Sequence, residues 1–174
     1  LHRVDRRQRQ MCIRDRVKCG AVMEREKRLQ GIVFLGGRFD YTPADLAMLN
    51  VPFVCCSYSN RYGTLIEGEY SSVSIADGDT AQQAVEELYR HGHRRIAALI
   101  SRPDDQSISQ LRYEGYIQAL ESHGIPVDPE LVICTGGFGA KDAYRAVQEK
   151  MAENVDFTAL FAIADSMACL LYTS

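Results

Sequence analysis

Gly-His-Arg-Arg-Ile-Ala-Ala-Leu-Ile, residues 92–100, is followed by a polar loop and then by Leu-Arg-Tyr-Glu-Gly-Tyr-Ile-Gln-Ala-Leu, residues 111–120. Gly92 predicts the end of a helix, because glycine adopts the left-handed backbone that closes one. The apolar run Ile96–Ile100 predicts a parallel strand that is covered on both faces. Ligands of open α/β sheets bind beyond the carboxyl ends of such strands. The loop 101–109 and the start of the next helix therefore form the candidate site.

The rest of the chain alternates between apolar runs and amphipathic segments. Thr42 and Pro43 have the residue types of a helix cap and a first helical position. The order of elements predicts an α/β fold with parallel, doubly wound sheets and right-handed crossovers. The predicted strands are 31–36, 51–57, 72–75, 95–101, 131–135 and 159–164, and the predicted helices are 42–49, 79–91, 107–123, 141–153 and one from 165.

The two ends of the chain share a relation at the level of DNA. The tail 169–174 can be encoded by TGTCTCTTATACACATCT, and the reverse complement of this segment encodes Met-Cys-Ile-Arg-Asp, the residues at 11–15. Such a relation is typical of a sequencing adapter read into an open reading frame. We therefore expect residues 1–16 and 169–174 to be non-native and leave them out of fold reasoning. The alternative is a native basic arm and a short apolar tail.

Charge and cysteine content narrow the function classes. Without residues 1–16, the formal net charge changes from −3 to −7. An acidic chain offers no electrostatic case for direct binding to phosphate backbones. No apolar run is long enough to span a bilayer, so we expect no membrane partner. The cysteines outside the end segments are Cys19, Cys55, Cys56 and Cys134. They show no Cys-x-x-Cys spacing, which favours a reduced, cytoplasmic setting.

The chain from about residue 30 to 168 resembles the effector-binding domain of the lactose/galactose-repressor (LacI/GalR) family of transcription regulators. The stretch 92–120 carries the resemblance together with Val73-Ser74-Ile75, the helix 80–90, Gly-Ile-Pro-Val-Asp-Pro-Glu at 124–130 and Ala-Asp-Ser-Met-Ala at 164–168. It implies a two-lobed fold of the periplasmic-binding-protein type, truncated at both ends. Residues 17–76 would form part of the amino-terminal lobe and residues 77–168 part of the carboxy-terminal lobe.

The resemblance also points to two ligand-binding residues in the second lobe. Arg112 falls in the Arg-x-x-Gly pattern where the family has an effector-contacting arginine, and a guanidinium can fork two hydrogen bonds to vicinal hydroxyls or a carboxylate. The alternative is a surface arginine paired with Glu114 or another nearby acid. Phe138 follows a strand, where an aromatic ring can lie against a sugar or a nucleobase. The alternative for Phe138 is a loop anchor.

Three more candidates come with departures from the family pattern. Asp165 belongs to the motif Asn-Asp-x-Met-Ala, but Ala164 stands in place of the asparagine that commonly bonds effector. Asp165 can bind ligand or cap the following helix, and the cap is favoured. Ser57 falls where relatives often carry a ligand-bonding aspartate, and it offers a neutral hydroxyl instead. Ser107 is expected to face the cleft, as is Asp105. The departures imply an effector unlike that of typical sugar repressors.

Three function classes compete. The first is a cytoplasmic regulator that binds a small sugar-like effector and acts, as a homodimer, on operator DNA through a headpiece absent from this chain. The second is an exported sugar-binding protein of a transport system, which shares the fold. The third is an enzyme, but the sequence shows no nucleophile–base pair or metal-ligand set, and fold alone cannot argue chemistry. We expect a regulator with no cofactor, no metal and no catalytic residues.

Overall fold

The computed structural model describes residues 16–36, 40–66 and 68–172. It divides into two compact units, which are considered separately. The first unit contains the described residues up to Ile75 together with Gln106–Ile108, and the second contains Ala76–Asp105 and the residues from Ser109 onward. The predicted α/β class with parallel sheets is confirmed.

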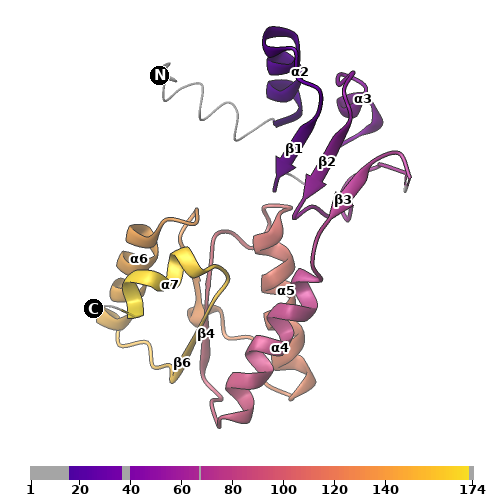
Figure 1. The fold of residues 1–174 in the computed structure, drawn as a ribbon. Helices are drawn as coiled ribbons and strands as arrows, with labels where there is room; N and C mark the ends of the chain where they lie inside the picture. Colours follow the sequence, from indigo (N-terminus) through magenta and orange to yellow (C-terminus); the bar gives the residue numbers. More distant parts are fainter. Residues whose placement is uncertain (1–15, 37–39, 67, 173–174) are drawn as a thin grey trace. The chain divides into compact units, whose positions relative to one another are not determined.

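The first unit is a three-stranded parallel sheet with two helices (Figure 1). Its strands lie in the order β1-β2-β3. Thr42 and Asp45 form a capping box at the start of α3, with Pro43 in its first turn, so the predicted cap is confirmed. The elements are α2 (Arg16–Lys27), β1 (Ile32–Leu35), α3 (Pro43–Leu46), β2 (Phe53–Cys56) and β3 (Ser71–Val73).

One face of this sheet is open within the unit. Phe34 and Cys55 are buried on the face whose residues contact α2 near Gly20. The opposite face carries Leu35, which pairs with Cys56, which in turn pairs with Val73. Leu35 is 67% exposed and Val73 66% exposed. Parallel sheets are usually covered on both faces, so an exposed apolar face on this sheet is unusual.

The second unit holds the predicted strand Ile96–Ile100 as β4 at the centre of a parallel sheet of order β5-β4-β6, with every residue of the strand buried. Figure 1 shows α4 and α5 on one side of this sheet and α6 and α7 on the other. The remaining elements are α4 (Asp77–Arg90), α5 (Ile108–Ser122), the 3-10 turn η1 (Pro129–Leu131), β5 (Val132–Cys134), α6 (Ala140–Ala152), β6 (Ala159–Ala162) and α7 (Asp165–Tyr172).

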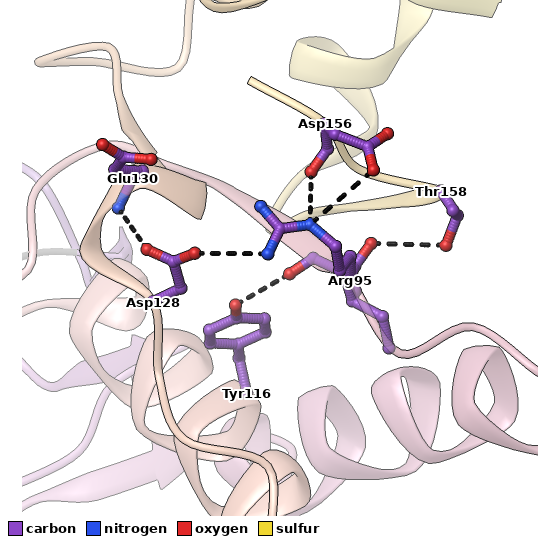
Figure 2. Close-up of polar contacts among 7 residues, drawn as sticks. Arg95, Tyr116, Asp128, Glu130, Asp156 and Thr158 are labelled. Carbon is purple, nitrogen blue, oxygen red and sulfur yellow. Dashed lines mark hydrogen bonds and ion pairs between the residues drawn. The ribbon is translucent and has the colours of Figure 1, made fainter. Parts of the chain in front are cut away.

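The amino-terminal edge of the second sheet is held together by polar contacts (Figure 2). Arg95 donates from Nε to the carbonyl oxygen of Asp156 at 2.8 Å and lies 3.6 Å from the carboxylate of Asp128. The buried hydroxyl of Tyr116 donates to the carbonyl oxygen of Ile96 at 2.8 Å. A pocket of about 230 Å³ opens beside Tyr116. The pocket lies at the amino-terminal ends of the strands, whereas ligands of such sheets bind beyond the carboxyl ends, so it is not the candidate site.

Three sequence expectations need correction or qualification. Helix α2 was not predicted, because its apolar residues do not keep to one side: Val17 is buried, whereas Val22 is 53% exposed. Cys19 is disulfide-bonded, contrary to the expectation of reduced thiols, while Cys55 is free. The segments expected to be non-native, 1–16 and 169–174, lie largely outside the described residues, and the part that is described continues α2 and α7.

None of the helices in the described ranges combines the length and the apolar composition that crossing a bilayer requires.

Candidate functional site

The carboxyl ends of the three strands of the second unit meet at one edge, where the predicted ligand loops begin. Thr135 donates its backbone N–H to the carbonyl oxygen of Ile100 at 3.0 Å, and Gly136 donates to that of Ser101 at 2.9 Å. On the other side of β4, Ile163 donates to the carbonyl oxygen of Leu99 at 3.2 Å. The loops that follow β4, β5 and β6 therefore start side by side, as expected for a ligand-binding edge.

Ser109 fixes the loop after β4, and sequence reasoning did not single it out. Its buried hydroxyl accepts hydrogen bonds from the backbone N–H groups of Ser101 (3.2 Å) and Arg102 (3.3 Å). The same hydroxyl donates to the carbonyl oxygen of Arg102 at 3.1 Å. A serine in the first turn of a helix after a polar loop is the signal that could have found it, because serine hydroxyls commonly bond nearby backbone groups.

Arg112 is anchored at this edge by an acid that is distant in sequence. Its Nε and Nη2 lie 2.9 Å and 2.7 Å from Oδ1 of Asp77, and its Nη1 donates to the carbonyl oxygen of Ile163. The Asp77 side chain is only 4% exposed and that of Arg112 is 27% exposed. Arg112 is therefore neither a solvated surface residue nor paired with Glu114. Of the five N–H groups of a guanidinium, two have no acceptor among the described residues.

Gly115 explains why Arg112 and Asp77 can meet. A Cβ atom at Gly115 would collide with the carbonyl oxygen of Gly78, so the backbones of α4 and α5 are in direct contact there. Residues three apart lie on the same face of a helix, and Arg112 is therefore carried to the same crossing as Gly115. In the Arg-x-x-Gly pattern, the glycine thus allows α4 and α5 to pack closely, and the arginine forms an ion pair with the first residue of α4.

Phe138 and Asp165 lie at the same edge. The Phe138 ring, 44% exposed, is on the loop between β5 and α6, and its carbonyl oxygen accepts a hydrogen bond from Ser166 at 3.0 Å. Asp165 is exposed, and its carboxylate has no partner among the described residues. The favoured cap role is wrong, because Ala164 accepts the first backbone bonds of α7 and so takes the cap position. Asp165 is instead the first residue of the helix.

Ser57 and Ser107 belong to the first unit. Ser57 directly follows β2, is exposed, and donates its backbone N–H to Val73 at 2.8 Å. Its φ of 53° lies in the left-handed region, which is uncommon for a residue other than glycine and often marks a functional position. Ser107 is half-buried and directly precedes α5. The structure thus brings Arg112, Phe138 and Asp165 to one edge of the second unit and places the two serines in the other.

Within the described ranges, no three His, Cys, Asp or Glu side chains come close enough together to hold a metal ion.

Comparisons with known proteins agree with this architecture. The profile of the family described as periplasmic binding proteins and sugar binding domain of LacI family matches residues 52–173. The HTH-type transcriptional regulator MalR of Clostridium butyricum is 34% identical over 145 residues, which cover 83% of this chain and 42% of the relative. The HTH-type transcriptional repressor CytR of Escherichia coli K12 is 32% identical over 142 residues, which cover 82% of this chain and 40% of that repressor. The chain thus spans about two fifths of the length of these relatives.

Solved structures of transcription regulators share this fold. A LacI-type transcription regulator from Bifidobacterium animalis subsp. lactis aligns with a TM-score of 0.73 at 19% identity, covering 90% of this chain and 57% of that one. The transcriptional regulator CelR in complex with cellobiose aligns with a TM-score of 0.66 at 26% identity, covering 90% of this chain and 48% of that one. The chain therefore belongs to the family of periplasmic binding proteins and sugar-binding domains of LacI-type regulators.

Proposed function

We propose that this chain is the effector-binding part of a LacI-type transcription regulator and that its effector is a small, neutral, sugar-like molecule. The observation that carries the proposal is the group at the carboxyl edge of the second sheet. There an anchored guanidinium with unused donors, an exposed carboxylate and an exposed aromatic ring come together in Arg112, Asp165 and Phe138. Donors, an acceptor and an apolar ring are what a hydroxyl-rich ring with C–H faces requires.

Charge favours a neutral ligand. The positive charge of Arg112 is already compensated by Asp77, and Asp165 adds an uncompensated negative charge. An anionic ligand would therefore meet a net negative edge, whereas hydroxyl groups can use the same atoms as hydrogen-bond partners. The CelR structure contains cellobiose, a neutral sugar. Because Ala164 and Ser57 replace residues that commonly bond effector in the family, we expect an effector other than that of typical sugar repressors.

We assign Ser57 and Ser107 to the effector site as contacts from the first unit. Effector binding would then favour one arrangement of the two units over the other, and unequal affinity for the arrangements is what lets a ligand shift them. In a homodimer such a change would alter the spacing of two DNA-binding headpieces on an operator. The acidic chain itself is not the DNA contact, and that role falls to a headpiece outside this chain. We assign the regulator to the cytoplasm.

The transport alternative has less support. MalR, CytR and CelR are all transcription regulators, and relatives of this kind favour a regulator over an exported sugar-binding protein. The same relatives give no support to an enzyme.

A thermal-shift screen of the purified 174-residue chain tests the proposal, with cellobiose, maltose, galactose, ribose and cytidine as probes. A ligand at 100 times its Kd stabilises the fold by about 2.7 kcal/mol. We expect at least one neutral sugar or nucleoside to raise the melting temperature, and galactose 6-phosphate to raise it less than its neutral counterpart galactose. No shift with any probe would contradict the proposed function.

Phe138→Ala is the matched site variant for the screen. Loss of the exposed ring should weaken binding of the active probe roughly 2- to 12-fold, the range expected for one aromatic contact. Met151→Ala is the control, because Met151 is also an exposed apolar residue of the second unit, 62% exposed and at the far end of α6. Equal loss of affinity in both variants would remove Phe138 from the site.

A further inference from the structure

Asp77 is a buried carboxylate with a single partner, Arg112, in the part of the chain that the structure describes. Its side chain is 4% exposed and both of its polar contacts go to Arg112, at 2.7 Å and 2.9 Å. A buried charge without a partner is strongly unfavourable. The Asp77 carboxylate therefore fixes the position of the Arg112 guanidinium, and the guanidinium neutralises the buried carboxylate.

Two further contacts restrict the position of Arg112. The carbonyl oxygen of Ile163, at the end of β6, accepts from Nη1. The close crossing of α4 and α5 at Gly78 and Gly115 fixes the distance between the helix that carries Arg112 and the helix that starts with Asp77. A long arginine side chain ordinarily loses much rotamer freedom when it binds a ligand. Here that freedom is already restricted before any ligand arrives.

Asp77 also stands at a particular place in the chain. It is the first residue of α4 and the second residue of the second unit, which begins at Ala76. Ala76, at the cap position of α4, provides no side-chain hydrogen bond. The ion pair with Arg112 thus fastens the first residue of α4, close to where the chain passes from one unit to the other.

We infer that Asp77 is a positioning residue of the effector site: it orients Arg112 toward the effector, and through the same ion pair effector binding reaches the start of α4, where the two units join. The inference rests on the proposed function, because it requires that Arg112 contact the effector. Asp77 itself uses its carboxylate for Arg112 and is buried, so it does not touch the effector. A change of affinity upon its substitution would therefore act through the guanidinium.

The first test needs no ligand. In NMR spectra of the 174-residue chain labelled with nitrogen-15 arginine, the Nε–H proton of Arg112 should exchange slowly with water, because Asp77 accepts from it. Asp77→Asn keeps the shape of the side chain but removes its charge, and it should accelerate this exchange at least tenfold. Asp79→Asn is the control, since it removes the same charge from the exposed side of the same helical turn and leaves Arg112 untouched. Equal exchange in both variants would overturn the inference.

The second test uses the sugar or nucleoside of the screen that binds. Asp77→Asn should weaken its binding roughly 3- to 30-fold, as expected for a residue that acts through a neighbour, and Asp79→Asn should leave its binding unchanged. If a probe binds the unmutated chain and Asp77→Asn with equal affinity, the inference fails while the proposed function stands. If no probe binds the unmutated chain, the proposed function fails first, whatever the Nε–H exchange shows.

A measurement on the unmutated chain covers the case in which Asp77→Asn does not fold. Hydrogen exchange of the backbone amides in the first turns of α4 should slow at least threefold when the binding probe is added. Slowing confined to the loops after β5 and β6 would contradict the coupling of effector binding to the start of α4.

Discussion

Gly115→Ala is the substitution that most directly tests the helix crossing behind the candidate site. The added Cβ would lie in collision with the carbonyl oxygen of Gly78 and 3.0 Å from both the Cβ of Ala81 and the backbone nitrogen of Gln82. Two of these three neighbours are backbone atoms of α4, which cannot rotate away as a flexible side chain can. Helix α4 must therefore shift as a whole, and the ion pair between Asp77 and Arg112 must stretch or break.

Two effects of opposite sign decide the magnitude. Alanine stabilises a helix by about 1 kcal/mol relative to glycine. Forcing an extra methyl group into a packed interior costs about 1–3 kcal/mol, and the backbone contacts at Gly115 place this cost in the upper part of that range. We expect a net loss of about 1–2 kcal/mol in the free energy of unfolding. For a chain of this size the melting temperature should fall by about 2–8 °C.

The assay is thermal unfolding followed by circular dichroism at 222 nm, with Gly78→Ala as the matched control. A Cβ at Gly78 would lie 3.5 Å from the carbonyl oxygen of Leu111, which is ordinary contact. Gly78→Ala gains helix propensity without a collision, so its melting temperature should stay the same or rise. If Gly115→Ala melts at or above the temperature of the unmutated chain, the close crossing and the argument built on it are refuted.

Three other predictions concern charge, pH and the open sheet face. Arg112→Ala should destabilise the chain by about 3–5 kcal/mol in urea unfolding because it leaves Asp77 buried and unpaired, and Arg112→Ala combined with Asp77→Leu should recover part of this loss; additive losses would contradict the pairing. Burial raises the pKa of Tyr116 to about 12, so its contribution to stability is complete below pH 10, its usual range, and is lost as the pH rises toward 12. Tyr116→Phe loses the bond to Ile96, costing about 1 kcal/mol, and should show a smaller fall in stability between pH 10 and 12; an unchanged fall assigns the effect to other groups. Leu35→Lys, on the open face of the first sheet, should change the free energy of unfolding by less than about 0.5 kcal/mol. It should also reduce self-association of the chain in sedimentation velocity. Unchanged association would show that copies of the chain do not associate through this face.

Local patterns predicted the elements around the site well. The run Ile96–Ile100 is a buried central strand, and Thr42 caps α3 as its residue type indicates. Such features depend on residues close together in sequence, which is why they could be predicted. Helix α2 was missed because its apolar residues do not recur at the spacing that marks one face of a helix. The cap of α7 was assigned one residue too late, at Asp165 instead of Ala164, because the residue type favours aspartate whereas the backbone bonds decide.

In the candidate site, too, the residue types could be predicted, whereas the partners that folding brings together could not. Arg112 and Phe138 could be named from the resemblance and from their places after predicted strands. The sequence could not show that a substitution of Arg112 disturbs the fold, because the partner that makes it structural is not a neighbour. Ser109, whose buried hydroxyl closes the loop after β4, was missed for a related reason: its place in the first turn of α5 marks it as a candidate, but only the folded chain shows that it bonds the backbone of Ser101 and Arg102.

The alternation of strands and helices, the parallel sheets and the family could all be inferred from the amino-acid sequence, because apolar periodicity, glycine positions and motif order are local properties of the chain. The partner of Arg112 could not be inferred in this way, because the folded chain pairs its guanidinium with Asp77, 35 residues away in the sequence. That pairing depends on two helices crossing so closely that only a glycine, Gly115, fits between them. Burial at the crossing makes the pair strong, since a carboxylate removed from water must find its counter-charge within the protein.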